Sequence, residues 1–494
     1  MRNFRLRRAL AVPTVAALLV ASSTACTASR SSSASQAASA GRMNVVFVLA
    51  DDLSMNLLPH MPNVQALAKD GTTFTNYTVT DSLCCPSRSS IFTGRYPHNT
   101  GVFTNSGKDG GFHKFQQTQE MDTIATTLKS NGYRTGFMGK YLNEYQPVDG
   151  VRPGWTDWAT GGNAYANFNY KLNENGAIKK YGSKPEDYLT TVVQNKAVTF
   201  INDAARRSQP FLLEIATFSP HGPYTPAPQD KNLFPGMTVP QTSAFNRHPR
   251  NAPSYLAAND PLTPQEISTL NGIYRKRAQS VQSIDRMIGT LRDTLSKAGI
   301  ADHTVVVFSS DNGFHLGDHG LNIGKQTAFS TDVHVPLVVA GPGIRTNTTV
   351  DQLAENIDLR PTFEGLAGIT SSGTADGTSL VPLLRTGKPA GDWRRLSLIE
   401  HHGPKTSEPA APDDPDKQNS KDGTPPTYTA IRTADWTFVQ YLDGTREYYD
   451  RTTDPDEMNN IAASLPAERV QALQASIKKM EACKGSTACT TATR

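Results

Sequence analysis

The amino-acid sequence predicts an α/β fold followed by a smaller antiparallel sheet. Three apolar runs, at 43–49, 211–218 and 304–308, are short, continuous and rich in β-branched residues, as expected for buried parallel strands. Segments with helical periodicity stand between these runs, and from about Trp393 short strands take over. A chain of 494 residues is long enough for one large domain and one smaller one.

Composition fits a globular protein with many loops. Hydrophobic residues make up 37% of the chain and charged residues 19%, with 37 glycines and 32 prolines. The net charge is only +4, and no basic cluster or base-reading motif accompanies it. We therefore expect no nucleic-acid partner, and at most a mild preference for acidic substrates.

The N-terminus has the pattern of an export signal. Several arginines precede an apolar run at 9–20, which is too short to span a bilayer, so residues 1–25 are predicted to be a signal peptide. Ser23-Thr24-Ala25-Cys26 resembles a bacterial lipobox. The protein is then either a lipoprotein, held at the membrane surface through an acylated Cys26, or a cleaved, secreted protein. The Ser/Ala-rich residues 26–41 suit a flexible tether.

The first strands place charged side chains at one edge of the sheet. Strand 43–49 is followed by Asp51 and Asp52, two carboxylates that repel each other unless a cation lies between them. A helix at 122–131 and a strand at 133–138 then lead to Lys140. Ligands of α/β sheets gather at the carboxyl ends of strands, so we expect these three residues to share a site.

The middle of the chain continues this pattern. Residues 150–184, with Trp155 and Trp158, are expected to form surface loops able to shape a sugar pocket. A helix at 188–205 precedes strand 211–218, and His221 follows the strand's end.

A capping box at Thr263 and Glu266 opens a long helix that ends at Gly299 and is expected to serve core packing only. Strand 304–308 is followed by Asp311 and Asn312. Two separate strands thus deliver pairs of oxygen ligands, which favour Ca²⁺ or Mg²⁺ over Zn²⁺.

The C-terminal part is predicted to be a small antiparallel sheet with one helix. Expected strands lie at 396–400, 428–432, 437–441 and 447–450, and the helix at 466–482. The Pro-rich, charged segment 403–427 is expected to be disordered.

His401 and His402 could reach the site but are expected at the surface. Cys483 and Cys489 are close enough in sequence to form a small disulfide loop. The expected domains are a catalytic domain at 42–390, a C-terminal subdomain at 391–482 and a tail at 483–494.

One motif concentrates the chemistry. In Cys84-Cys85-Pro86-Ser87-Arg88 a cysteine pair precedes a short helix, predicted at 87–93 and stopped by Gly94. Cys84 would lie just ahead of a helix N-terminus, which favours an anion, and Arg88 adds a fork of donors for an oxyanion. A polarised group beside an anion site is what a nucleophile for a phosphate or sulfate ester requires.

This motif, continued by Ser89-Ser90-Ile91-Phe92-Thr93-Gly94-Arg95, resembles the signature of the type I sulfatases. In that family the first cysteine is oxidised to formylglycine, an aldehyde, by a separate formylglycine-generating enzyme. The resemblance implies an alkaline-phosphatase-like mixed sheet between helices, and hydrolysis of a sulfate ester with release of inorganic sulfate. It covers roughly residues 42–482.

The resemblance also implies roles for individual residues. The residues it assigns to catalysis are Cys84, Arg88, Lys140, His221 and Lys325. Those it assigns to a Ca²⁺ (or Mg²⁺) site are Asp51, Asp52, Cys84, Asp311 and Asn312. Those it places near the substrate are His315 and Asn143.

In the family, one hydroxyl of the hydrated aldehyde attacks sulfur, and deprotonation of the other expels sulfate. Many arylsulfatases have Trp-His after the lysine, whereas Tyr141-Leu142 stands here. The base for sulfate expulsion is therefore unassigned, since Asn143 cannot act as one.

The run from Gly139 to Tyr145 and the doubled cysteine most resemble the N-acetylglucosamine-6-sulfatase and extracellular endosulfatase branch. That implies a sulfated sugar, such as 6-O-sulfo-N-acetylglucosamine, or an aryl sulfate as substrate. Two alternatives stay open. A phosphoesterase of the same superfamily predicts a Ser or Thr nucleophile and two metals with histidine ligands. A catalytically dead, surface glycan-binding protein predicts gaps in the residue set, and only the missing histidine fits.

Overall fold

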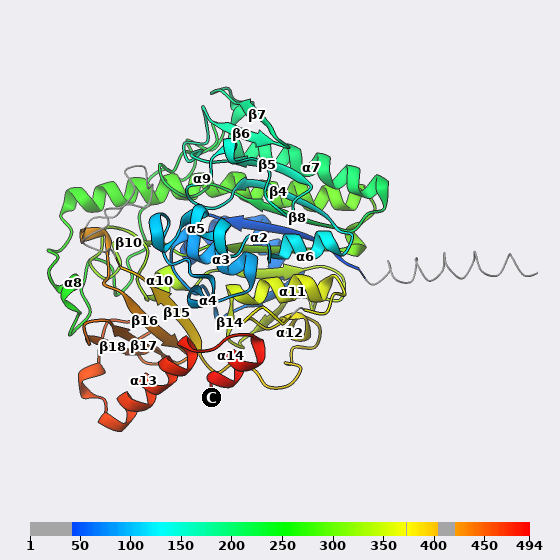
Figure 1. Cartoon of the computed structure of the whole chain (residues 1–494). Coiled ribbons are helices and arrows are strands. Elements are labelled where there is room, and N and C mark those ends of the chain that lie inside the picture. The colour runs from blue at the N-terminus through cyan, green and yellow to red at the C-terminus, as the bar shows by residue number, and fades with distance from the viewer. Residues whose placement is uncertain (1–41, 372, 404–419) are drawn as a thin grey trace, which may run out of the picture. The chain divides into compact units, whose positions relative to one another are not determined.

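The computed structural model describes residues 42–371, 373–403 and 420–494 (Figure 1). The expected signal peptide, the tether and Cys26 lie outside the described residues, as does most of the segment expected to be disordered. Residues 43–494 form one compact unit, so the expected boundary near residue 390 stays a prediction. In the described part of the chain, no helix has the length and apolar character needed to cross a bilayer.

A ten-stranded mixed sheet forms the centre of this unit (Figure 1). Its strand β1 pairs in parallel with β8 on one side and β9 on the other, whereas β12, β6 and β7 run antiparallel to their neighbours. The strand order is β13 (Thr348–Val350), β2 (Gly71–Phe74), β12 (Leu337–Ala340), β9 (Thr304–Ser310), β1 (Asn44–Ala50), β8 (Phe211–Ala216), β4 (Arg134–Lys140), β5 (Asp157–Gly161), β6 (Lys171–Glu174) and β7 (Ala177–Lys180).

Helices cover both faces of the sheet, because alternate side chains of its strands point to opposite sides. Val45 and Phe47 of β1 belong to one apolar core, and Val46 and Val48 to the other. The helices packed on the first core are α3 (Cys84–Thr93), α5 (Gly111–Thr118), α6 (Ile124–Ser130), α11 (Leu359–Leu366) and α12 (Val381–Thr386). Those packed on the second are α2 (Pro62–Lys69), α7 (Leu189–Arg207) and α9 (Pro264–Lys297).

Short elements complete the main part of the unit. Two small sheets pair β3 (Tyr77–Thr78) with β14 (Ala354–Glu355) and β10 (His315–Leu316) with β11 (Ile323–Gly324). The short helices are α4 (Pro97–Thr100), α8 (Ser254–Ala257) and α10 (Ser330–Val333).

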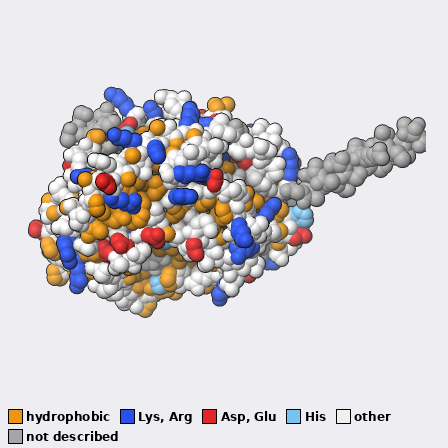
Figure 2. Space-filling view, turned by 90° about the horizontal axis from the view of Figure 1, so that it is seen from below, with side chains coloured by type: hydrophobic (Ala, Val, Ile, Leu, Met, Phe, Trp, Pro, Cys, Tyr) orange, Lys and Arg blue, Asp and Glu red, His pale blue; other side chains and the backbone are white. Residues whose placement is uncertain are grey.

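The predicted small antiparallel sheet is confirmed. It has four strands, β15 (Ser397–His401), β16 (Tyr428–Arg432), β17 (Trp436–Tyr441) and β18 (Arg446–Asp450). Helix α13 (Ala467–Glu481) follows, and a disulfide bond joins Cys483 to Cys489 of α14 (Ser486–Ala492). Figure 2 shows charged side chains of both signs interspersed with apolar ones on the face seen from below, in keeping with the small net charge.

The prediction of surface loops at 150–184 was wrong. Strands β5, β6 and β7 extend the sheet there, and Trp155 and Trp158 are buried. Trp158 packs against Phe137 and donates its indole N–H to Tyr145 Oη at 2.9 Å. Burial of large aromatic surface outweighs the Gly/Asn-rich composition that suggested loops.

Candidate active site

Two acidic strand ends meet at the centre of the sheet. Because β1 and β9 pair in parallel with Ala50 opposite Ser310, Asp51–Asp52 and Asp311–Asn312 leave the sheet side by side. The backbone N–H of Asp52 donates to Asp311 Oδ1 at 3.0 Å, and Asn312 Nδ2 donates to Asp52 Oδ1 at 2.6 Å. Asp52 has a left-handed φ of 65°, a costly conformation for a non-glycine residue that the surrounding contacts hold in place.

Cys84 lies against these carboxylates. Its Sγ lies 3.4 Å from Asp51 Oδ1 and 3.8 Å from Asp52 Oδ1, so either carboxylate can accept from the single S–H. The helix α3 begins at Cys84 itself, not after Pro86 as predicted, and it ends at Gly94 with a φ of 67°. The backbone N–H of Cys85 donates to Asn105 Oδ1 at 2.9 Å, so this one amide is already engaged.

Two lysines bracket the thiol. Lys325 Nζ lies 2.9 Å from Cys84 Sγ and 2.6 Å from Asp52 Oδ1. Lys140 Nζ donates to both oxygens of Asp51, at 2.9 and 2.8 Å. Lys140 ends β4 directly after Gly139, where an added Cβ would lie 1.8 Å from Ala216 O. Glycine at 139 thus allows β4 to approach β8 closely where the lysine emerges.

Arg88, one turn into α3, contacts both the aspartate and the lysine segments of the cluster. Its Nε donates to Asp311 Oδ2 at 2.8 Å and its Nη1 to Lys140 O at 2.8 Å. All of these side chains are buried, which strengthens their mutual electrostatic effects. Burial would lower the pKa of Lys140, but Asp51 beside it raises that pKa well above its usual value. Burial raises the pKa of Asp51 to about 6 although Lys140 lowers it. The pKa of Asp311 is held well below its usual value, because Arg88 and the two lysines outweigh the effect of burial.

The acidic residues fit a divalent metal ion. Ligand atoms of Asp51, Asp52, Cys84 and Asp311 all lie within 4.8 Å of one another. Asn312 Oδ1 is buried and has no hydrogen-bond partner among the described residues, an arrangement that is costly unless a further group binds the oxygen. Hard oxygen donors of this kind favour Ca²⁺ or Mg²⁺.

His221 closes one side of the cluster. It follows β8, and its Nε2 lies 3.6 Å from Asp52 Oδ2 while its Nδ1 lies 2.9 Å from Gly222 O. The ring of Tyr165 packs on His221 with centroids 4.5 Å apart, and Lys140 Nζ lies 5.0 Å from the centroid of the same ring. Tyr165 belongs to the segment expected to form surface loops, and no sequence pattern marked it.

Arg277 of α9 was also missed, since this helix was expected to serve packing only. Its guanidinium is buried and donates to Asp52 O at 2.5 Å, to Ser54 Oγ at 3.3 Å and to Pro220 O at 3.4 Å. It also lies 4.2 Å from the centroid of the Phe314 ring. A signal was present in the sequence, because position 277 falls within the apolar stripe of the helix, between Tyr274 and Val281.

The structure does not bring His315 into this cluster. Its Nδ1 lies 3.0 Å from Asp332 Oδ1 and its Nε2 3.0 Å from Asp422 O, so both ring nitrogens have partners, and its role in substrate binding stays a prediction. His315 pairs with Gly324 across β10 and β11 and thereby holds the segment that carries Lys325. Asn143 is buried, and its backbone carbonyl accepts a hydrogen bond from the backbone N–H of Phe112 at 2.8 Å.

The surface location expected for His401 was wrong. His401 is fully buried on β15, and its Nδ1 lies 3.6 Å from Asp81 Oδ1. Burial lowers the pKa of His401 to about 3. His402 is partly exposed, and its Nδ1 lies 2.7 Å from Asp109 Oδ2.

Comparison with known proteins gives this arrangement a context. The sulfatase family model matches residues 43–369. The N-acetylglucosamine-6-sulfatase of Homo sapiens is 35% identical over 480 residues, covering 91% of this chain and 86% of that protein. An extracellular sulfatase SULF-1 homolog of Drosophila melanogaster is 36% identical over 388 residues, covering 76% of this chain and 34% of that protein.

Solved structures show the same fold. A protein in complex with its substrate D-glucosamine-2-N,6-O-disulfate aligns with a TM-score of 0.75 and 21% identity, over 89% of this chain and 97% of that one. The phosphonate monoester hydrolase of Silicibacter pomeroyi aligns with a TM-score of 0.69 and 20% identity, over 89% and 94%.

The fold is therefore an alkaline-phosphatase-like sulfatase fold. Two findings assign the chain to a family with this fold: the family model matches more than half of the chain, and the identity to curated relatives extends over most of it. The chain belongs to the sulfatase family and is a sulfuric ester hydrolase.

Proposed function

We propose that this enzyme removes sulfate from a sulfated amino sugar, with 6-O-sulfo-N-acetylglucosamine as the leading candidate and an aryl sulfate as a simpler substrate. The observation that carries the proposal is the convergence of Lys325 and the two aspartates on Cys84 Sγ. The similarity over most of the chain to N-acetylglucosamine-6-sulfatases supports the choice of sugar.

Charge favours an anionic ester at this position. Three buried cations, Arg88, Lys140 and Lys325, face the three carboxylates Asp51, Asp52 and Asp311. A bound divalent cation makes the site net positive, which suits a sulfate ester and the charge that grows on its oxygens during the reaction.

The metal ion would be held by Asp51, Asp52, Asp311 and Asn312, together with the group at position 84. When bound, it supplies Lewis-acid polarisation of the sulfuryl oxygens. Two observations support this assignment: the ligand atoms of the acidic residues lie close together, and Asn312 Oδ1 has no hydrogen-bond partner among the described residues.

Position 84 would carry the nucleophile. In the structure it is an unmodified cysteine, and its Sγ stands for the oxygen of a formylglycine made from it. As a hydrated aldehyde, that group would supply one hydroxyl to attack sulfur with loss of the alcohol, and a second hydroxyl whose deprotonation would expel sulfate by C–O cleavage and restore the aldehyde. Lys325, in contact with the atom at this position, would lower the energy of an ionised hydroxyl there.

The remaining residues would bind and orient the ester. Lys140 and Arg88 would neutralise sulfuryl oxygens, each such donor being worth about 3–4 kcal/mol of barrier. His221 would hold a proton at Nε2, the nitrogen that faces the cluster, and deliver it to the leaving alcohol. Tyr165 would fix the orientation of the imidazole by packing on its ring.

The proposal includes export. The pattern of residues 1–25, the candidate lipidation site at Cys26 and the disulfide between Cys483 and Cys489 support an oxidising, extracytoplasmic compartment. Relatives named extracellular sulfatases agree with this. A lipid on Cys26 would hold the enzyme at the membrane surface.

Two measurements on protein from its natural host test the proposal. Mass spectrometry of the tryptic peptide ending at Arg88 should find an aldehyde in place of the Cys84 thiol, and sulfate release should be faster from N-acetylglucosamine 6-sulfate than from its 3- and 4-sulfate isomers. Cys84→Ser should abolish turnover, whereas Cys85→Ser, which changes the neighbouring buried cysteine, should keep most of it. An unmodified thiol in a host that makes active sulfatases would rule out this mechanism.

A further inference from the structure

Two buried polar side chains that the proposed mechanism does not use face each other beside the loop that leads to the nucleophile. Asp81 lies three residues before Cys84, and His401 lies on β15 of the C-terminal sheet. Neither is exposed to solvent, and His401 Nδ1 lies 3.6 Å from Asp81 Oδ1. Both carboxyl oxygens of Asp81 and both ring nitrogens of His401 make no hydrogen bond with a described residue. Such a group of atoms calls for an explanation, because buried polar groups are nearly always hydrogen-bonded.

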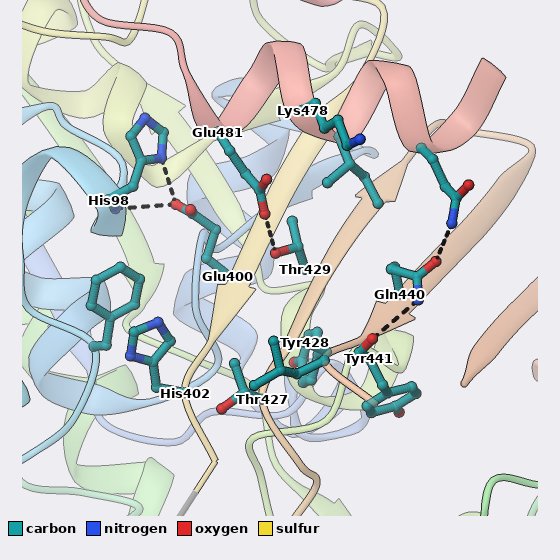
Figure 3. A pocket seen from close by; sticks show the side chains of 14 residues that line it. His98, Glu400, His402, Thr427, Tyr428, Thr429, Gln440, Tyr441, Lys478 and Glu481 are labelled. Atoms are coloured by element: carbon teal, nitrogen blue, oxygen red, sulfur yellow. Dashed lines mark hydrogen bonds and ion pairs between the residues drawn. The ribbon is translucent and has the colours of Figure 1, made fainter. Parts of the chain in front are cut away.

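Strand alternation explains where the imidazole of His401 points. Figure 3 shows its two neighbours on β15, Glu400 and His402, at the cavity between the C-terminal sheet and α13. Successive side chains of a strand point to opposite faces, so His401 is turned away from this cavity and toward Asp81. The C-terminal sheet thereby presents one imidazole to the loop that carries the candidate nucleophile.

Backbone contacts on either side of Asp81 join it to two other segments. The carbonyl of the preceding residue accepts from the backbone N–H of Glu400 on β15 at 2.8 Å. The carbonyl of the following residue, Ser82, accepts from the backbone N–H of Gln326 at 3.2 Å, and Gln326 directly follows Lys325. A displacement of Asp81 is therefore transmitted both to the C-terminal sheet and to the segment that carries the lysine.

Side-chain contacts hold the same lysine segment. Ser82 Oγ donates to Thr327 O at 2.9 Å, and Tyr428 of β16 donates its hydroxyl to Gln326 O at 2.9 Å. Lys325, next to Gln326, places its Nζ 2.9 Å from the sulfur of the candidate nucleophile. The distance between lysine and nucleophile thus depends on how the loop around Ser82 is held.

Burial favours the neutral forms of both facing groups. It raises the pKa of Asp81 well above its usual value; Glu400 adds to this effect, whereas His402 and Lys325 oppose it. Burial also lowers the pKa of His401 to about 3. A protonated carboxyl is a donor and a neutral imidazole has one acceptor nitrogen, so the two groups complement each other. A small rotation of either side chain closes the 3.6 Å gap to a hydrogen bond.

We propose that Asp81 and His401 are a positioning pair, whose hydrogen bond fixes the nucleophile loop on the C-terminal sheet and so directs Lys325 at position 84. Neither residue touches the reacting atoms; both act through the loop contacts of Ser82. This inference rests on the proposed function, because its effect is exerted on the group at position 84. If the pair only filled space, apolar side chains of similar size would serve as well.

The first test replaces both partners by apolar groups. Asp81→Leu combined with His401→Phe keeps the buried volume, so the melting temperature should be unchanged or higher. The kcat for 4-nitrophenyl sulfate and for N-acetylglucosamine 6-sulfate should nevertheless fall about 10–100-fold, because a small misplacement of a reacting group has an effect of this size. KM should stay unchanged, since Lys140 and Arg88 still bind the ester. Rates are expressed per aldehyde, measured by mass spectrometry in each variant.

Two single variants complete the comparison. The side-chain amide of Asp81→Asn can donate to the same imidazole nitrogen, so this variant should keep most of the wild-type kcat. Ser397, at the start of β15, also has a buried hydroxyl without a hydrogen bond to a described residue. Ser397→Ala is therefore the matched control and should leave kcat unchanged. If the double variant does not fold, His401→Leu alone takes its place in the same assays.

These measurements can overturn the pair without touching the proposed function. Wild-type kcat in the folded double variant would do so, as would a loss of kcat in Asp81→Asn as large as that in the double variant. Equal losses in Ser397→Ala would also overturn it, because they would show that any unpartnered polar group on β15 matters alike.

Failure of the proposed function would look different. If wild-type protein shown to carry the aldehyde hydrolyses neither ester, the pair is tested by crystal structures alone. The distance from Lys325 Nζ to the atom at position 84, 2.9 Å here, should increase by about 1 Å in the double variant and stay the same in Ser397→Ala. An unchanged distance in the double variant would overturn the positioning role.

Discussion

Arg277 offers the sharpest test of how the site is held together. Its guanidinium reaches from α9 to the backbone carbonyls of Asp52 and Pro220. Asp52 is itself a candidate metal ligand, and Pro220 directly precedes His221. Arg277→Met keeps the length and apolar stem of the side chain but removes these hydrogen bonds. The carbonyls then lose their donor in a buried environment.

The expected size of the effect follows from the contacts. Hydrogen bonds from a charged donor contribute about 1.5–3 kcal/mol each, but the substitution also relieves the burial of a guanidinium that has no carboxylate partner among the contacts described. Burial lowers the pKa of Arg277, which reflects that cost, so the free energy of unfolding should change less than the hydrogen bonds alone suggest. Activity should fall more clearly, because removing the support of a metal ligand typically costs about 10–100-fold in metal affinity or rate.

The assay is kcat/KM as a function of Ca²⁺ concentration, with thermal unfolding recorded in parallel. Arg277→Met should need more Ca²⁺ for half-maximal activity and lose 10–100-fold in kcat/KM. Arg277→Lys keeps the positive charge but not the several N–H donors of the guanidinium, so its kcat/KM should lie between those of the wild type and Arg277→Met. Arg275, on the same helix but bound to Met237 O, supplies the control Arg275→Met. Wild-type kcat/KM and Ca²⁺ dependence in a folded Arg277→Met would refute the reasoning.

Three further outcomes are expected. Lys140→Met should lower kcat by about 10²–10³-fold in steady-state assays, because one donor to the sulfuryl oxygens is lost; a smaller effect than tenfold would contradict its role. Chelation should abolish activity and lower the melting temperature, since the facing carboxylates lose their cation, and Ca²⁺ at 100 times its Kd should restore about 2.7 kcal/mol. Burial raises the pKa of Glu214 from 4.5 to about 8, so the folded state keeps a proton that the unfolded state loses, and this contribution to stability declines as the pH rises from 4.5 to about 8. Glu214→Gln should therefore raise the free energy of unfolding at pH 7 by roughly 3 kcal/mol. In urea titrations the free energy of unfolding of this variant should also depend less on pH than that of the wild type. Parallel pH profiles for the two proteins would contradict the prediction.

The sequence allowed the centre of the site to be predicted because it is built from strand ends. Continuous apolar runs such as 43–49 and 304–308 mark buried strands, and parallel strands bring whatever follows them to one edge. Asp51, Asp311 and Lys140 thus meet as expected.

Contacts made by side chains from distant, irregular segments were not predictable in this way. Tyr165 reaches the site from a stretch with no periodicity. His315 faces Asp332 because local pairing, not strand direction, sets its orientation. Arg277 was foreseeable in principle, since a charged residue inside an apolar stripe needs a buried partner. His401 was misplaced because a charged, Pro-rich flank suggested a surface position, while strand alternation turns its ring inward.

The complete burial of Cys84 has a consequence for how the enzyme is made. No part of its side chain is exposed, and its Sγ is enclosed by Lys325, Asp51 and Asp52 within a helix that is itself buried along its whole length. A second enzyme cannot reach that sulfur without displacing the centre of the molecule. If Cys84 is converted to an aldehyde, conversion has to precede folding, so the timing of synthesis, modification and export would determine how much of the protein is active.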